Sequence, residues 1–309
     1  VFPEQFRSTK LLRAWLGRLG DAGVRFEFGA RWTELRQPAS EGPAGIGLRF
    51  ERAGASFDVE AEVAVFALGG GSWPRTGSDG GWVEAFAAVG VQVAPLVPAN
   101  CGVAVPWSEV FVERFEGAPL KNVAAIVDGA VVRGDPIVTR SGLEGGPIYA
   151  HSARIRRNIC ESGSAGMTID LRPDHSHDAL TRRLETSRPK ESMSRRLRRA
   201  GFDPVAVGLL REGTANRLPR DAGAIAELAK SVPVPVSGLL SLDRAISSAG
   251  GIAFDEIDDR FMLRRLPGVF VAGEMLDWEA PTGGYLLQAT FSTAVAAARG
   301  ALTWLERRA

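Results

Sequence analysis

The sequence predicts an α/β fold in which one domain is interrupted by an insert. Residues 63–90 and 268–300 each combine an apolar run, a turn of small residues and a helix-forming segment. From about residue 95 the chain becomes rich in Pro and Val, and it then becomes mostly helical. Such an order is typical of an α/β domain with an insertion. The expected ranges are 1–94 with 246–309 for the α/β domain, and 95–245 for the insert, β-rich over 95–175 and helical over 176–230.

The composition is that of a globular protein without a general affinity for polyanions. The 309 residues are 45% apolar and 24% charged, and the net charge is +1. A chain this long can bury a sizeable core, and so small a net charge gives no overall attraction to nucleic acid or acidic membranes. Cys101 and Cys160 form no CxxC pair, which favours a reducing compartment. Because no long apolar run exists, we expect a cytoplasmic protein without membrane spans.

The N-terminal region reads as a helix followed by short strands. Residues 8–23 place Leu12, Trp15, Leu16 and Leu19 on one helical stripe, and Ser8 can cap the helix start. Residues 24–28 alternate apolar and charged side chains, which predicts a half-buried strand. Further extended stretches, with a turn at 37–45, suggest an antiparallel meander; they are 31–36, 46–51 and 56–60.

A glycine cluster follows the next apolar run. Residues 63–68, "VAVFAL", have no polar alternation, so we expect a strand buried on both faces, as in a parallel sheet. Gly69, Gly70 and Gly71 end it, and a helix is expected over 82–90. Glycine lets backbone approach a ligand, and ligands bind at the carboxyl ends of parallel strands. An ordinary turn without a ligand is the alternative.

A second cluster lies near the C-terminus. The apolar run 268–272 ends at Gly273 and Glu274, and Gly283 with Gly284 precedes a helix expected from Tyr285. The first N–H groups of a helix lack internal partners and favour negative charge on a ligand. Glu274 and Asp277 are candidate acceptors for ligand hydroxyls. The alternatives are a glycine hinge before a packed helix and acidic residues of an exposed turn.

The interrupting segment offers fewer chemical signals. Strands are expected at 101–105, 122–127, 130–133, 167–171 and 232–238, with one more near 252–254. Residues 181–220 hold ten Arg and one Lys against four acids, a local charge of +7. Nucleic-acid binding through phosphates is conceivable, but no RNA-binding or zinc-finger motif accompanies these residues, so solvated helical faces are expected.

Histidines and a loop give weaker candidates. His175 and His177 lie in a polar loop, which favours a solvated loop over a metal site. Tyr149, His151 and Arg154 follow the loop 139–147 and are candidates to line a substrate cleft.

Several stretches resemble the YhiN-like (BaiN/RdsA-type) flavoproteins. The resemblance is carried by "FALGGGSWPRTGSDGGWVEAFAAVGVQVAPLVPA" (66–99), "TRSGLEGGPIYAHSA" (139–153), "SAGGIAFDEID" (248–258) and "LPGVFVAGEMLDWEAPTGGYLLQATFSTAVAAARG" (266–300). It implies a glutathione-reductase-type FAD-binding domain split by the insert. It also implies FAD contacts at Gly69 and Gly70, at Gly273 and Glu274 along the ribityl chain, and at Gly283, Gly284, Tyr285 and Leu286 against the pyrimidine edge.

The chain departs from that family at its start. No GxGxxG precedes residue 24, so the first βαβ unit, with the pyrophosphate loop and the ribose-binding acid, is missing, and we expect a truncated chain. The implied function is an FAD-dependent oxidoreductase that transfers a hydride or electron pair to or from an unknown organic substrate, with NAD(P)H as a candidate reductant. The alternatives are a flavin-binding module that acts on RNA or a protein partner, and an inactive fragment. No catalytic residue can be named, and oligomeric state stays open.

Overall fold

The computed structural model describes residues 7–36, 45–186 and 191–308. Its helices are α1 (Ser8–Asp21), α2 (Trp82–Ala88), α3 (Glu109–Phe115), α4 (Gly146–Tyr149), α5 (Ser152–Ser162), α6 (His177–Glu185), α7 (Met193–Arg199), α8 (Pro204–Glu212), α9 (Ala222–Lys230) and α10 (Tyr285–Glu306). The strands of one part of the molecule are β1 (Arg31–Arg36), β2 (Ile46–Arg52), β3 (Ala55–Ala61), β4 (Ala64–Phe66), β5 (Val93–Ala99), β14 (Ser247–Ile252) and β15 (Val269–Val271). Those of the other part are β6 (Val103–Ala104), β7 (Val123–Val127), β8 (Ala130–Gly134), β9 (Ile137–Thr139), β10 (Gly142–Glu144), β11 (Ala165–Asp170), β12 (Val232–Val236) and β13 (Gly238–Leu239). The 3₁₀ turns are η1 (Pro74–Thr76), η2 (Leu242–Arg244), η3 (Phe254–Glu256) and η4 (Gly273–Met275).

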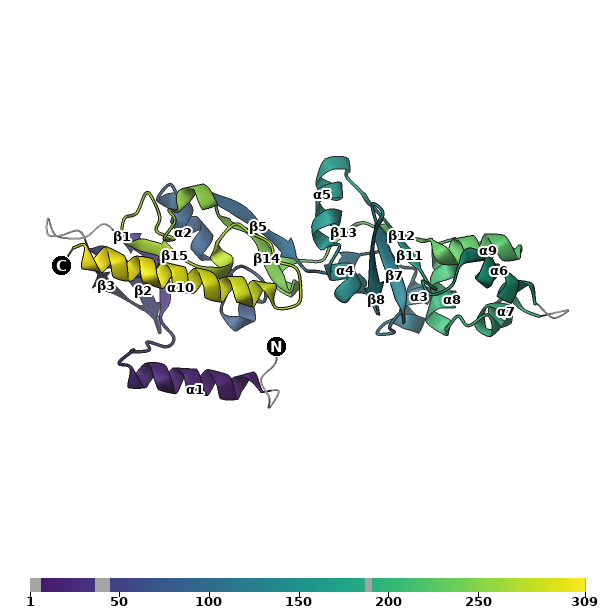
Figure 1. The fold of residues 1–309 in the computed structure, drawn as a ribbon, viewed down its shortest axis with the longest axis horizontal. Coiled ribbons are helices and arrows are strands. Elements are labelled where there is room, and N and C mark those ends of the chain that lie inside the picture. Colours follow the sequence, from purple (N-terminus) through teal and green to yellow (C-terminus); the bar gives the residue numbers. More distant parts are fainter. Residues whose placement is uncertain (1–6, 37–44, 187–190, 309) are drawn as a thin grey trace.

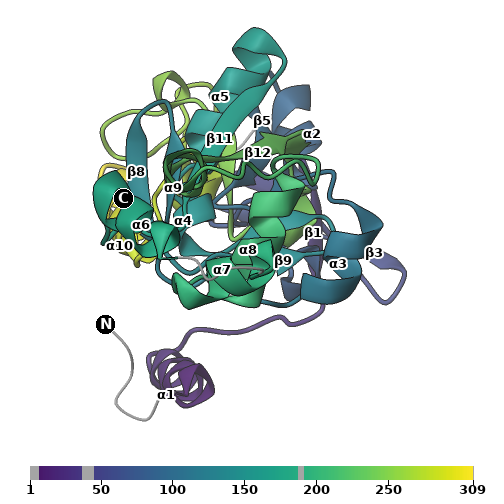
Figure 2. The same cartoon turned by 90° about the vertical axis from the view of Figure 1, so that its right-hand side faces the viewer.

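The molecule is a mixed α/β structure, elongated, with two parts side by side (Figure 1). The first part holds β1–β5, β14, β15, α2 and α10, and α1 lies beside it, where the Trp15 ring meets the Phe291 ring of α10 with centroids 5.9 Å apart. The second part holds the remaining strands and α3–α9. Figure 2, viewed along the long axis, shows α1 on the outside of the first part.

The first part is built from three small sheets around an apolar core. The meander β1–β2–β3 is antiparallel, β5 pairs with β14 antiparallel, and β4 pairs with β15 in parallel. The core includes Phe66, Phe86, Val271 and Leu276, all buried. Helix α10 packs against β15 through small residues, since a side chain at Gly300 would meet the Phe270 ring at 2.8 Å.

The second part has its own apolar core between two four-stranded sheets and the helices α3–α9. The strand orders of the two sheets are β13-β6-β10-β9 and β12-β11-β7-β8, and every strand pairing within these sheets is antiparallel. Leu143, Ile155, Ile169, Leu209 and Ile225 are completely buried in this core. Short turns join β7 to β8 and β9 to β10, whereas α6–α9 all lie between β11 and β12.

Two runs of chain connect the parts, and they lie next to each other. The Ile246 N–H donates to the Asn100 carbonyl at 3.2 Å, and the Leu240 N–H donates to the Gly102 carbonyl at 2.9 Å. The two connecting runs, 100–102 and 240–246, are therefore hydrogen-bonded to each other, and together we call them the crossing.

Most expected elements are present, with three corrections. Residues 24–28 form no strand: Val24, Phe26 and Phe28 are exposed, because no neighbouring strand pairs with this connection. The strand expected near 252–254 lies at 247–252 instead, and its register shifts between Ala249 and Gly251, as at a β-bulge. Strand β4 is buried on one face only, with Val65 46% exposed.

The remaining expectations fall partly outside what the structure describes. The predicted turn at 37–45 and part of the helical segment 176–230 include residues 37–44 and 187–190, which lie outside the described ranges. The predicted apolar stripe on α1 forms, but none of its side chains is buried. Within the described ranges, no helix has the length and apolar character needed to cross a membrane.

Candidate functional site

The parallel pairing of β4 with β15 brings two glycine-containing turns to one edge. Val271 is the register partner of Phe66, and the Ala272 N–H donates to the Phe66 carbonyl at 3.0 Å. Both strands then end, so the loop 67–71 and the turn η4 leave the pair at the same carboxyl edge. This edge is where ligands bind in parallel α/β sheets.

The loop after β4 is held by side chains that bond its carbonyls. Gly69 has a φ of 73°, a conformation that favours glycine. Ser78 Oγ donates to the carbonyls of Leu68 at 2.9 Å and Gly70 at 2.5 Å, and Trp82 Nε1 donates to that of Gly69 at 2.9 Å. With its carbonyls bound from one side, the loop has a fixed path.

Gly70 lies where any side chain would collide. A Cβ built on it would be 2.3 Å from Ser248 Oγ and 3.0 Å from Glu274 Cδ. Ser248 Oγ also accepts the Gly71 N–H at 2.7 Å, in a fully buried contact. The loop after β4, strand β14 and the turn after β15 therefore meet at Gly70.

Glu274 joins these three segments. Its Oε1 accepts the Ser248 N–H at 2.7 Å, and the Gly70 N–H also bonds this carboxylate. Burial raises the pKa of Glu274 above its ordinary value, while the two backbone N–H groups act in the opposite direction. A carboxylate offers about four acceptor positions, so two bonds leave capacity for hydroxyl donors of a ligand.

The start of α10 forms a separate group. Gly283 and Gly284 have φ of 109° and 94°, both are exposed, and Gly284 is the N-cap without a side-chain cap bond. Tyr285 is 62% exposed and Leu286 is half-buried. The 22-residue helix thus begins with N–H groups that no side chain of its N-cap satisfies. Gly273 contacts the same helix, because its N–H donates to Thr293 Oγ1 at 3.0 Å.

The segment before this helix start is anchored by a buried polar group. Asn100 Nδ2 donates to Ser247 Oγ at 2.8 Å and to the Ala280 carbonyl at 2.7 Å. Arg156 forms an ion pair with Glu279, and both side chains are largely buried. Residues of the crossing and of α5 therefore fix the approach to Gly283.

The HI0933-like protein Rossmann domain matches residues 1–300. The chain belongs to this family. Among curated relatives, the 3-dehydro-bile acid delta(4,6)-reductase of Clostridium scindens is 23% identical over 267 residues, which are 78% of this chain and 62% of that protein. The ribosomal RNA dihydrouridine synthase of Escherichia coli is 25% identical over 254 residues, 78% of this chain and 61% of that protein.

The chain thus spans less than two thirds of the length of these HI0933-like relatives. Among solved structures, a 3-ketosteroid delta1-dehydrogenase from Sterolibacterium denitrificans aligns over 92% of this chain and 61% of its own, with a TM-score of 0.45 and 14% identity.

Sequence reasoning overlooked the residues that organise the site. Ser248, Ser78 and Asn100 were not singled out, although Ser248 lies in the small-residue run that resembles this family. Ser248 and Asn100 bond segments about 180 residues away, as Asn100 does with Ala280, so no local pattern reveals their partners. Ser78 bonds the loop eight and ten residues before it. Asp277 was a candidate acceptor and is exposed beside β14, where its N–H donates to the Ile252 carbonyl.

Two other candidates are histidines of the second part. His151 is 1% exposed, its Nε2 lies 3.1 Å from the Ala125 carbonyl, and burial lowers its pKa, so it is a core residue and the expectation of a cleft position is wrong. His177 contacts Asp178 and the Gly223 carbonyl. Over the described ranges, no three His, Cys, Asp or Glu side chains gather as a metal site would require.

Proposed function

We propose that this chain is part of an FAD-dependent oxidoreductase. The observation that carries the proposal is the meeting of Gly70, Ser248 and Glu274 at the carboxyl edge of β4 and β15. In this proposal the FAD-binding domain is 1–99 with 246–309 and the insert is 100–245; the boundary expected at residue 95 moves because β5 pairs with β14. Membership in a Rossmann-domain family and the reductase activity in the name of one relative support it.

The residues present fit FAD at three places. Gly69 and Gly70 are assigned to the dinucleotide, because they form the loop at the carboxyl edge of β4, where ligands bind in parallel α/β sheets. Glu274 and Gly273 are assigned to the ribityl chain, because the half-buried carboxylate retains acceptor capacity beyond its two backbone donors. The exposed start of α10, at Gly283, Gly284, Tyr285 and Leu286, is assigned to the pyrimidine edge.

The role of each group follows from its chemistry. Bound FAD supplies hydride or electron-pair transfer to an organic substrate that is still to be identified, with NAD(P)H as the proposed reductant. The uncapped N–H groups of α10 favour negative charge at the edge that they face. Glu274 holds the Gly70 loop against β14, so it orients the backbone that approaches the dinucleotide. The names of the two relatives specify a bile acid and ribosomal RNA, and they do not converge on one substrate class.

The test compares flavin retention in two matched glycine variants. Gly284→Ala adds a methyl group at the helix start, where nothing lies within 4 Å and φ is 94°. Gly163→Ala is the control, because Gly163 caps α5 with a φ of 75° and also has nothing within 4 Å. Both pay a similar backbone strain, about 1–3 kcal/mol.

The measurement is flavin absorbance per protein after mixing with FAD and desalting, followed by NAD(P)H oxidation with an electron acceptor. We expect Gly284→Ala to retain at least tenfold less FAD than Gly163→Ala at equal folded fraction. Equal retention in both variants would reject the assigned role of the α10 start. Absence of flavin binding both in the unmodified protein and in a longer chain that carries the pyrophosphate loop would reject the proposed function.

A further inference from the structure

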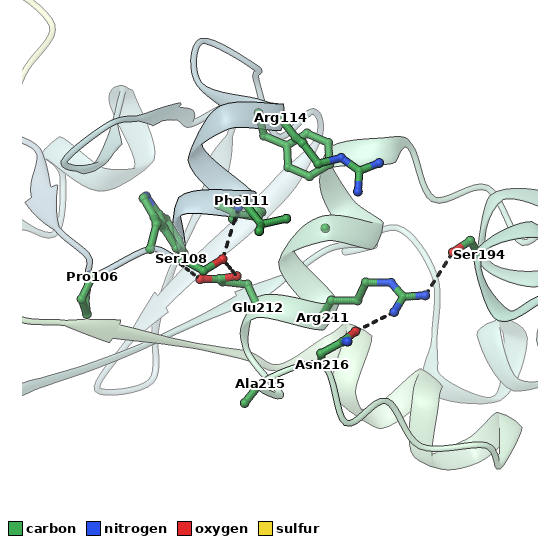
Figure 3. A pocket seen from close by; sticks show the side chains of 13 residues that line it. Pro106, Ser108, Phe111, Arg114, Ser194, Arg211, Glu212, Ala215 and Asn216 are labelled. Carbon is green, nitrogen blue, oxygen red and sulfur yellow. Dashed lines mark hydrogen bonds between the residues drawn. The ribbon is translucent and has the colours of Figure 1, made fainter.

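A second candidate site lies in the other part of the molecule, between α3 and α8 (Figure 3). It is a cavity of about 760 Å³, a size typical of small-molecule sites. None of its lining residues belongs to the proposed FAD site. They are Pro106, Trp107, Ser108, Val110, Phe111 and Arg114 from the α3 region, and Gly208, Arg211, Glu212, Ala215 and Asn216 from the α8 region, with Phe115 and Ser194.

One wall of the cavity is a row of aromatic rings. The centroids of Trp107 and Phe111 lie 4.8 Å apart, and those of Phe111 and Phe115 lie 5.2 Å apart. Phe115 rests directly on α8 at Gly208, where an added Cβ would be 2.3 Å from its ring. The rings are tilted against each other by 42° and 53°, and the half-buried Trp107 and Phe115 offer apolar ring faces on which an aromatic or fused-ring ligand can stack.

Two guanidinium groups lie on the same cavity. Arg114 and Arg211 also line an adjoining hollow of about 350 Å³, to which Arg198 contributes, so the basic side continues beyond the aromatic row. Arg211 donates to Asn216 Oδ1 at 2.6 Å and to Ser194 Oγ at 3.1 Å (Figure 3). Both acceptors are uncharged, so they hold the guanidinium in place without neutralising it.

The position of Asn216 is itself constrained. Ala215 and Asn216 both have positive φ, 47° and 63°, and the Asn216 N–H donates to the Arg211 carbonyl at 2.6 Å. Left-handed backbone at Ala215 is costly, and such strain is found where a structure fixes a ligand-binding geometry. Here the left-handed backbone of Ala215 and Asn216 positions the Asn216 side-chain amide, which orients Arg211.

The side chains that line the cavity carry a net positive charge. Glu212 is its one acidic lining residue, and its two oxygens accept the Ser108 N–H at 2.6 Å and the Ser108 hydroxyl at 2.9 Å. Among the ion pairs found in the described ranges, none involves Arg114 or Arg211. A ligand with an acid group would therefore meet uncompensated guanidinium groups.

We propose that this cavity binds a small organic anion with a flat aromatic or fused-ring body and one carboxylate, sulfonate or phosphate group. The ring body stacks on Trp107 or Phe115, the two half-buried rings of this wall. The acid group pairs with Arg211 and Arg114. The site is separate from the flavin site, so the proposal stands or falls independently of the oxidoreductase assignment.

The test uses 2-naphthalenesulfonate as the probe and the neutral 2-naphthalenemethanol as its comparison, both by calorimetry. We expect the sulfonate to bind at least tenfold more tightly than the alcohol. Arg211→Met should weaken the sulfonate at least tenfold and leave the alcohol unchanged. Val110→Glu, at a side chain that is 64% exposed and lines the cavity, should do the same without affecting the fold.

The matched control is Arg182→Met, which removes an exposed arginine of the same basic tract outside this cavity. It should bind the sulfonate as the unmodified protein does. Equal binding of sulfonate and alcohol, equal loss in all three variants, or no heat of binding would overturn the proposal. A single-stranded RNA oligonucleotide that binds here while the sulfonate does not would also overturn it.

Discussion

Alanine at Gly70 should break the contact that joins three segments of the proposed FAD site. Gly70 is not in the left-handed region, so the substitution adds no backbone strain and its effect is steric. The new Cβ would lie 2.3 Å from Ser248 Oγ and 2.8 Å from Ser248 Cβ. Ser248 must therefore move, and its 2.7 Å bond from the Gly71 N–H is lost.

The expected cost has two terms. Overpacking of a closely packed site costs about 1–3 kcal/mol. A buried backbone N–H without an acceptor costs about 1–3 kcal/mol more. We expect Gly70→Ala to lower the free energy of unfolding by about 2–6 kcal/mol.

Ser248→Gly removes the colliding atoms and also removes the acceptor for Gly71. Alone it should cost about 1–3 kcal/mol for that bond. In the double variant the bond is lost once and the collision with Ser248 is absent, so the double should be more stable than the sum of the single effects predicts, by about 2–6 kcal/mol.

The assay is urea unfolding followed by circular dichroism, with hydrogen exchange at the Gly71 amide as a local readout. Gly166→Ala is the control, because Gly166 lies in β11 with nothing within 4 Å and should be unchanged or slightly more stable. A cost for Gly70→Ala below about 0.5 kcal/mol, or additivity of the two substitutions within that limit, would refute the reasoning.

Three further outcomes are expected. Gly142→Ala should abolish folding of the second part, because its Cβ would lie 1.9 Å from the Val103 carbonyl, and wild-type-like melting would contradict this. Burial lowers the pKa of His151 below its ordinary 6.5, so the contribution of the neutral imidazole to stability is complete above that pH and is lost as the pH falls. The urea midpoint should therefore decline from about pH 7 to about pH 5, and His151→Gln should make that decline shallower. An unchanged decline in the variant would count against this role. Burial raises the pKa of the Cys101 thiol to about 11 whereas Cys160 is exposed, so a disulfide reagent at mildly alkaline pH should label one thiol quickly, and fast labelling of two would disprove this.

The sequence predicted the architecture of the glycine turns but not the contacts that hold them. An unbroken apolar run followed by glycines is a local signal, and it located both β4 and β15. Ser248 is positioned by the pairing of β5 with β14, where it lies opposite Pro98. Register between strands about 150 residues apart depends on the packed core, and periodicity does not reveal it.

The errors have physical causes of the same kind. Alternation at 24–28 predicted a strand, but a strand needs a partner ladder, and this connection has none. His151 follows a polar loop and looked accessible, yet its imidazole reaches the Ala125 carbonyl of β7 inside the core. The cavity between α3 and α8 was also missed, because Arg114 and Arg211 are brought together only by tertiary packing.

The crossing between the two parts has a topological consequence. The chain leaves at Asn100 and returns at Ile246, and these two residues share a backbone hydrogen bond. The two ends of the segment 101–245 are therefore close enough together for a short turn to connect Asn100 directly to Ile246. Residues 101–245 can in principle be excised, replaced by another folded unit, or used to open new termini by circular permutation, with the β5–β14 ladder left intact.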